Sequence, residues 1–273
     1  MKRPAVRTMA GAALAACAAA GAFAQQQSAE PPQPLQLRLD RGLELRLGAQ
    51  RVSGDLGDWR ERSLWGSYRA GAHLLQAELA SQRRFGDSGT YGALTDTVTL
   101  DADWFASLTL GAGDGAFFLP RYRADAFVHR KLLPDRRLVA SLGVGYYRAP
   151  DGHIDRNVTV GGANYFAAPW VVQAAVRFNE SDPGSVRARQ QFVAVTYGRE
   201  RDDLVVGRYG WGRESYLAIG PARALVDFAS REASIQWRHW FDARHGIAVG
   251  LEHYRNPLYE RSGGFVSWIV DIP

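Results

Sequence analysis

The sequence predicts an all-β protein, a closed antiparallel transmembrane β-barrel of about 14 strands preceded by a cleaved signal peptide. Three observations lead to this prediction. The first residues have the features of a secretory signal. The rest of the chain alternates apolar and polar residues with a period of two, and short turns alternate with longer Gly- and Asp-rich connections.

The N-terminal segment determines the expected location of the protein. Lys2, Arg3 and Arg7 form a positive region, an Ala- and Leu-rich stretch follows, and Ala22-Phe23-Ala24 is a small-x-small cleavage site. We therefore expect a signal peptide over residues 1–24, a polar, Pro-rich linker over residues 25–34, and the barrel over residues 35–273. The expected location is the outer membrane of a Gram-negative bacterium.

Cys17, the only cysteine in the chain, offers an alternative interpretation of the same segment. Leu14-Ala15-Ala16-Cys17 fits a bacterial lipobox, in which the cysteine would carry a lipid anchor. The apolar run continues past Cys17 to Ala24, which favours cleavage after Ala24.

The formal charge gives little support for a nucleic-acid partner. Cleavage after Ala24 removes Lys2, Arg3 and Arg7 and no acidic residue, so the formal net charge falls from +5 to +2. A nucleic-acid-binding protein would need a clustered basic face in the mature chain, so we expect no such partner.

Several segments show the alternation expected of strands that face two different environments. Leu43, Leu45 and Leu47 share one face, and Glu44 and Arg46 share the other. The same split recurs at 122–129, 170–179 and 233–238. In a soluble sandwich the apolar face would meet a second sheet. The unequal connections favour instead a barrel wall with lipid on its apolar side.

The connections set the expected number of strands. Tight turns are predicted at 69–71, 100–103, 133–136 and 242–244, and longer loops at 53–58, 86–90, 111–120, 149–155, 180–185, 212–227 and 254–264. Counting the segments between them gives about 14 strands. Twelve is the alternative if the weak segments near Ser63 and Val205 are not strands. Closure is required because an open sheet edge in lipid would leave backbone groups without hydrogen-bond partners.

Aromatic residues near strand ends suggest interfacial girdles, although strands are aromatic-rich in any β protein. The residues concerned are Trp59, Trp65, Trp104, Tyr146, Tyr147, Trp170, Tyr197, Tyr209, Trp211, Trp237, Trp240, Tyr254 and Trp268.

Between Asp58 and about Tyr216 the chain resembles the YaiO-type outer-membrane β-barrel family. The resemblance is carried by the following segments: Asp58-Trp59, Arg84-Phe85-Gly86, Phe117-Phe118-Leu119-Pro120-Arg121-Tyr122-Arg123, Ser141-Leu142-Gly143-Val144-Gly145-Tyr146-Tyr147, the pair from Val158 to Phe178, and Val205-Val206-Gly207-Arg208-Tyr209-Gly210-Trp211-Gly212-Arg213-Glu214. Each segment is short, so specificity comes from their order and spacing. The resemblance implies an outer-membrane barrel and a loose association with polysaccharide export, and it implies no established activity.

The polar face supplies the candidate lumen-facing residues. They are Glu44, Arg46, Glu78, Arg123, Asp125, His129, Arg177, Glu232, Arg238 and Glu252. Such side chains either line an aqueous path or pair and fill the interior. We expect a structural ion-pair network rather than a selectivity device, because buried charges are usually paired.

The enzymatic alternative is a lipid- or glycan-modifying hydrolase, which would need Ser, His and an acid converging near the outer rim. His129, His153, His239, His245 and His253, with Ser63, Ser67 and Ser267, are available, but none lies in a recognisable motif. We expect no catalytic residues, no metal site and no cofactor. The Gly-rich segment 111–115 has no following helix, which favours a surface loop over a phosphate site.

The expected function is therefore non-enzymatic, either a narrow channel or an envelope component associated with exopolysaccharide or surface glycan. Expected partners are outer-membrane lipid and lipopolysaccharide, the barrel-assembly machinery and, as a further candidate, polysaccharide. Lys131 is the only lysine after residue 24, and arginine suits phosphate contact with lipopolysaccharide. A compositional preference for arginine codons explains the same excess, and we favour that explanation.

Overall fold

The computed structural model describes residues 39–167, 169–199 and 201–273, which form a closed antiparallel barrel of 14 strands. The expected signal peptide and linker lie outside the described residues. The strands are β1 (Arg41–Val52), β2 (Trp59–Ala70), β3 (His73–Arg84), β4 (Asp87–Thr99), β5 (Trp104–Gly113), β6 (Tyr122–Leu132), β7 (Leu138–Arg148), β8 (Ile154–Tyr165), β9 (Trp170–Asp182), β10 (Val186–Gly198), β11 (Leu204–Gly220), β12 (Arg223–Trp240), β13 (His245–Arg255) and β14 (Glu260–Asp271).

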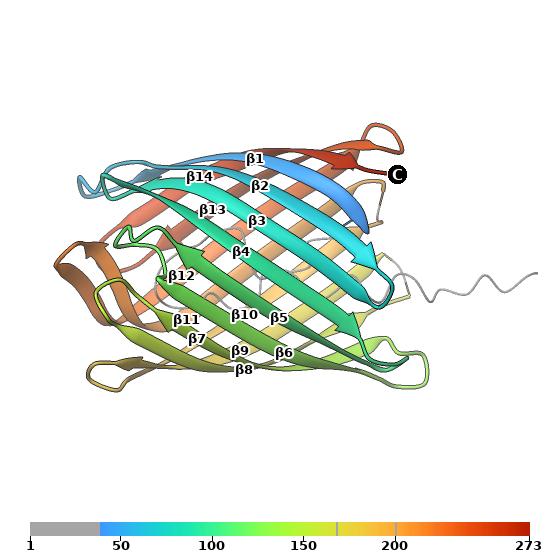
Figure 1. Ribbon diagram of the computed structural model, residues 1–273, viewed down its shortest axis with the longest axis horizontal. Coiled ribbons are helices and arrows are strands. Elements are labelled where there is room, and N and C mark those ends of the chain that lie inside the picture. The colour runs from blue at the N-terminus through green and yellow to red at the C-terminus, as the bar shows by residue number, and fades with distance from the viewer. Residues whose placement is uncertain (1–38, 168, 200) are drawn as a thin grey trace, which may run out of the picture.

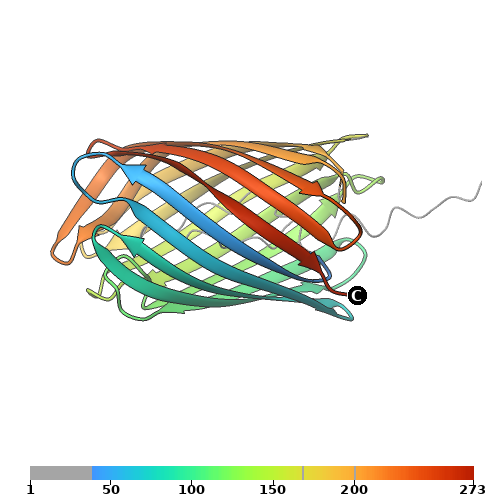
Figure 2. The same cartoon turned by 90° about the horizontal axis from the view of Figure 1, so that it is seen from above.

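Each strand pairs with its sequence neighbours, and β1 pairs with β14 to close the wall (Figures 1 and 2). The weak segments near Ser63 and Val205 are strands β2 and β11, so the barrel has 14 strands and not 12. An even strand number brings residue 41 and residue 271 to the same end of the barrel. We call this the inner end, because short turns and termini of such barrels face the periplasm, and the opposite end the outer end.

No helix among the described residues is long and apolar enough to cross a membrane.

The outward face of the wall is apolar, as the alternation predicts. Leu45 is 51% exposed and Leu94 67% exposed, whereas Arg46, beside Leu45 in the sequence, is 1% exposed. A soluble protein would not expose so many large apolar side chains around its whole surface. Lipid must therefore cover the outside, and the barrel interior contains the polar side chains.

Three of the expected outer loops are mainly strand, and a fourth is half strand. Most of 86–90, 212–227 and 254–264, and residues 180–182 of 180–185, lie in paired strands. Their Gly and polar residues suggested loops. The hairpins nevertheless continue outward, since each strand satisfies the backbone groups of its partner, as Gly220 does opposite Arg223. Strands β11 and β12 are the longest, with 17 and 18 residues.

The aromatic girdle is confirmed only in part. Exposed rings gather at the inner end, among them Trp104, Trp170, Tyr197, Trp237 and Trp268. Five of the predicted girdle residues instead have buried side chains that point inward: Trp59, Trp65, Tyr147, Trp240 and Tyr254. For these five residues the expected interfacial position is wrong.

Candidate functional site

The candidate site is the interior of the barrel, and all ten polar residues predicted to face it lie at inward positions. Six of them, Arg46, Glu78, Asp125, His129, Arg177 and Arg238, are buried. The side chains of Glu44, Arg123 and Glu232 retain limited exposure, and Glu252 on β13 shares the inward face with buried Tyr254. The structure does not gather the ten into one cluster.

Glu44 is the centre of an ion-paired group in the middle of the barrel. Its carboxylate accepts hydrogen bonds from Arg46 Nη2 at 2.7 Å and from Arg238 Nη2 at 3.4 Å. Arg46 also donates from Nε to Ser267 Oγ at 3.1 Å, and its guanidinium lies 4.0 Å from the Phe265 ring centroid. Because β13 and β14 separate β12 from β1, the Arg238–Glu44 contact reaches across the inner surface of the wall.

A second ion pair on the same side joins neighbouring strands. Arg208 on β11 pairs with Glu232 on β12, and the Arg208 guanidinium lies 4.8 Å from the Phe192 ring centroid. Together with the group around Glu44, it forms what we call the ion-paired layer: Glu44, Arg46, Arg208, Glu232 and Arg238.

On the side of the interior opposite the ion-paired layer, inward side chains are more often uncharged. The charged groups there are separate from one another. Arg123 pairs with Asp125 at 2.5 Å, and Arg177 donates to Thr159 Oγ1 at 3.2 Å. His129 is hydrogen-bonded to Ser141 Oγ at 2.8 Å. Between these groups the wall presents mostly hydroxyl and amide side chains, including Thr95, Thr97, Ser107, Thr109, Asn157, Gln173 and Thr196.

The inward charges that sequence reasoning missed include Glu61, Arg84 and Arg261, which lie nearer the outer end. Arg84 lies 4.0 Å from Glu61 and 4.8 Å from the Trp59 ring centroid, and Arg261 lies 4.6 Å from the same ring. The signal was present, because Arg84 has the same parity on β3 as the predicted Glu78. These charges lie beside the apolar residues that gather at the outer end.

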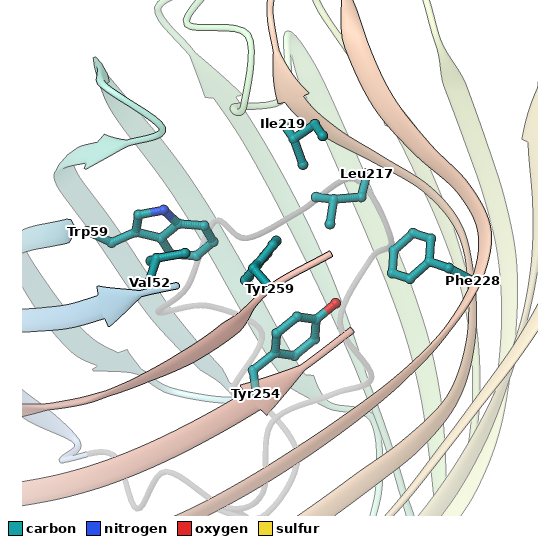
Figure 3. Packing of buried hydrophobic residues seen from close by; sticks show 7 residues of the cluster. All are labelled: Val52, Trp59, Leu217, Ile219, Phe228, Tyr254 and Tyr259. Carbon is teal, nitrogen blue, oxygen red and sulfur yellow. The ribbon is translucent and has the colours of Figure 1, made fainter. Parts of the chain in front are cut away.

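An apolar cluster, which we call the cap, fills the interior at the outer end. Figure 3 shows Val52 and Trp59 from one side of the barrel pointing toward Leu217, Ile219 and Phe228 from the other. Tyr254 and Tyr259 lie between the two groups (Figure 3). Every labelled side chain in this cluster is buried.

Residues between β3 and β6 extend the cap. Phe85 lies 5.0 Å from Trp59 and 6.1 Å from Phe117, measured between ring centroids. Phe118 and Leu119 are buried against Tyr91. Apolar side chains from five outer connections or strand ends therefore meet over the lumen at its outer end.

The outer part of β11 leans inward to reach the cap, and Gly212 allows this change of direction. Gly212 has φ +147°, and a Cβ there would overlap the backbone carbonyl of Arg189. Beyond it, both Glu214 and Ser215 are buried, whereas in a wall strand one of two neighbours would face out. The Gly212-Arg213 part of the family resemblance thus has a structural reason.

Polar contacts hold the inward-leaning hairpin on both sides. Ser215 Oγ accepts a hydrogen bond from Asn179 Nδ2 at 2.6 Å and is hydrogen-bonded to Ser181 Oγ. Ser181 donates its single hydroxyl proton to Asp155. On the other side, the Tyr254 hydroxyl donates to Glu214 Oε1 at 2.8 Å.

The Ser, His and Asp residues near the outer end are not arranged as in a hydrolase. His153 Nε2 lies 3.0 Å from Asp155 Oδ1, but Ser181 contacts the carboxylate and not the imidazole. Nearer the inner end, His129 does contact Ser141, yet its Nε2 is buried without a hydrogen-bond partner in the described residues. Neither set provides the Ser–His–acid order that activates a nucleophile.

No group of three or more His, Cys, Asp or Glu side chains that could hold a metal ion occurs in the part of the chain that the structure describes.

A closed antiparallel barrel with an apolar exterior and a polar interior defines a transmembrane barrel of the bacterial outer membrane. Within that class, residues 40–217 match the YaiO membrane beta barrel domain, and the chain belongs to this family. The resemblance noted in the sequence is thereby confirmed, as is the outer-membrane location.

Several solved structures share the fold at very low sequence identity. The chain is similar to the CymD monoaromatic hydrocarbon channel, with TM-score 0.58, 7% identity, and coverage of 85% of this chain and 88% of that one. It is also similar to a bacterial polysaccharide outer membrane secretin, with TM-score 0.52, 10% identity, and coverage of 85% and 98%. A third similar structure is the outer membrane protein Omp33 of Acinetobacter baumannii, with TM-score 0.50, 8% identity, and coverage of 84% and 97%.

A comparison with curated proteins finds no match. The similar solved structures therefore support the fold of the chain and not its specificity.

Proposed function

We propose that this protein is a non-enzymatic outer-membrane channel for a hydrophilic solute of the glycan class, with its outer mouth closed in the present conformation. One observation carries the channel proposal. Around the lumen, the inward-facing side chains of Glu44, Arg123 and Glu232 remain 13–19% exposed. Because buried charges are costly unless they are paired or hydrated, this exposure supports a lumen that holds water or a polar solute beside them.

The balance of charge favours a solute with little net charge. The inward-facing cations are Arg46, Arg84, Arg123, Lys131, Arg177, Arg208, Arg238 and Arg261, and the inward-facing anions are Glu44, Glu61, Glu78, Asp125, Asp155, Glu214, Glu232 and Glu252. Neither sign dominates, which disfavours a strongly ion-selective constriction.

The neutral side of the lumen supports a glycan in particular. Hydroxyl and amide groups such as Thr95, Thr109 and Gln173 can exchange hydrogen bonds with sugar hydroxyls. The similar solved structure described as a polysaccharide outer membrane secretin agrees with this choice of solute. The alternative is a barrel that stays closed, transports no solute and serves only as an envelope component.

The test compares conductance with the cap intact and disrupted. In planar bilayers we expect low conductance from the native protein and about tenfold or more from Phe117→Ser/Phe118→Ser/Leu119→Ser, because these changes remove apolar contacts that close the mouth. Liposome swelling with neutral oligosaccharides should increase in the same variant.

Phe166→Ser/Phe241→Ser/Leu133→Ser is a matched control, since it removes the same residue types from exposed positions at the inner end. This control should conduct like the native protein. A cap variant that folds, by heat-modifiable gel migration, yet neither conducts nor supports swelling would reject the channel. Altered envelope lipids in a deletion strain, by mass spectrometry, would favour the hydrolase instead.

A further inference from the structure

Strands β1, β2 and β3 are adjacent (Figure 1), and together they carry four arginines on their outward faces near their outer ends. We call Arg51, Arg60, Arg62 and Arg83 the arginine patch; all four are exposed. Arg60 and Arg83 stand directly opposite each other across the β2–β3 pairing. Like charges in this arrangement repel, so the sheet carries an electrostatic penalty that an anion would relieve.

The four arginines of the patch lie on adjacent strands and have no acidic partners among the described residues. None of its four guanidinium groups forms an ion pair within the described residues, and Arg51 lies opposite Ser262 and Arg83 opposite Ser88. Several exposed arginines elsewhere on the rim do have acidic partners. These pairs are Arg156–Asp182, Arg187–Glu180, Arg213–Asp227 and Arg255–Glu260.

None of the nearby carboxylates forms an ion pair with the patch within the described residues. Asp55 and Asp58 lie in the β1–β2 connection beyond the strands, and Asp87 accepts the backbone N–H of Ser88 at 2.8 Å. Glu260 pairs with Arg255. The surface therefore has uncompensated positive charge on three neighbouring strands.

The residues just below the patch indicate what kind of anion fits. Toward the inner end, the same outward faces continue with Leu47 on β1, Leu64 on β2 and Leu79 on β3, which are 46–57% exposed. A row of arginines directly above an apolar surface is complementary to a lipid, because the arginines can bind a phosphate headgroup and the leucines can contact its acyl chains. A free anion in solution would make no use of the leucines.

We propose that the arginine patch binds the phosphate groups of lipopolysaccharide in the outer leaflet, while its acyl chains lie on the leucine surface below. Arginine suits this role because its planar guanidinium can hold phosphate oxygens through two hydrogen bonds. This inference depends on the outer-membrane location and not on what passes through the lumen.

The test measures binding of bisphosphorylated lipid A to the purified protein in detergent by native mass spectrometry. Arg51→Gln/Arg60→Gln/Arg62→Gln/Arg83→Gln should bind it about tenfold or more weakly, because several basic residues act on one anionic headgroup. Dephosphorylated lipid A should bind the native protein and this variant alike. Inorganic phosphate at millimolar concentration should not compete appreciably.

A matched control removes the same number of charges from the paired arginines: Arg156→Gln/Arg187→Gln/Arg213→Gln/Arg255→Gln. It should retain lipid A binding. The proposal would be overturned by equal losses of binding in both variants or by no loss in the patch variant. It would also be overturned if the native protein bound dephosphorylated lipid A as tightly as bisphosphorylated lipid A. If the fourfold variant fails to fold, Arg60→Gln/Arg83→Gln, compared with Arg156→Gln/Arg187→Gln, serves the same test.

Discussion

The outer mouth and the middle of the lumen are filled by opposite kinds of chemistry. In the cap, rings such as Trp59 and Phe85 pack on apolar neighbours, and the contacts have little directional requirement. In the ion-paired layer, Glu44 is held between Arg46 and Arg238, and each partner must be present at a defined position.

This difference supports the proposal that one barrel combines a closed outer mouth with a wet interior. Apolar groups can separate and repack without leaving a charge unpaired, so a cap of this kind is suited to opening. The ion-paired layer lies against the wall, where side chains from β1, β11, β12 and β14 satisfy one another and keep the lumen polar. We therefore expect the cap to control access and the layer to determine what the lumen accepts.

The largest expected effect comes from the cap. Trp59→Ala should lower the free energy of unfolding by about 3–5 kcal/mol, because this side chain is 3% exposed and packs on Phe85 and Tyr259. Urea unfolding in lipid vesicles, followed by far-UV circular dichroism, measures it. Trp170→Ala, at a ring that is 46% exposed on the lipid side, should cost clearly less. Equal losses would mean that the cap contributes no more than an interfacial ring.

An intermediate effect is expected in the ion-paired layer. Arg46→Met should lower the free energy of unfolding by roughly 2–3 kcal/mol, because Glu44 loses its nearer partner while lumen water still reaches its carboxylate. Adding Glu44→Gln should recover part of this loss, about 1 kcal/mol, in a double-mutant cycle.

Arg187→Met is the control for that cycle, since Arg187 pairs with Glu180 at an exposed position, and it should change stability by less than about 1 kcal/mol. A cycle in which the effects of Arg46→Met and Glu44→Gln simply add would contradict the description of the layer as coupled.

The alternation along the chain was enough to predict the wall and the inward residues, because a two-residue period assigns each side chain to one face. Glu44, Arg46 and Arg238 lie inward for that reason. The cap was not predicted. Trp59 was assigned to an interface, although it shares its parity with inward Glu61, because the sequence gives no sign that the lumen itself turns apolar at the outer end.

The hairpin of β11 and β12 shows the same limit. Gly and polar residues over 212–227 suggested a loop, yet they form paired strands that lean over the mouth. That geometry depends on contacts between distant segments, such as Ser215 with Asn179, which no local pattern contains.

The smallest expected effect lies in an exposed turn at the inner end, away from both cap and layer. Asp242 accepts backbone hydrogen bonds from Arg244 at 2.6 Å and His245 at 2.8 Å, and these, led by Arg244, lower its pKa to about 2. Because the unfolded carboxyl titrates near 3.9, the stabilisation is complete above about pH 4 and is lost as the pH falls toward 2. Asp242→Asn keeps an acceptor oxygen but cannot titrate, so its urea midpoint should fall slightly less than that of the native protein between pH 4 and pH 2. Identical slopes for the two proteins would show that this turn contributes nothing to acid sensitivity.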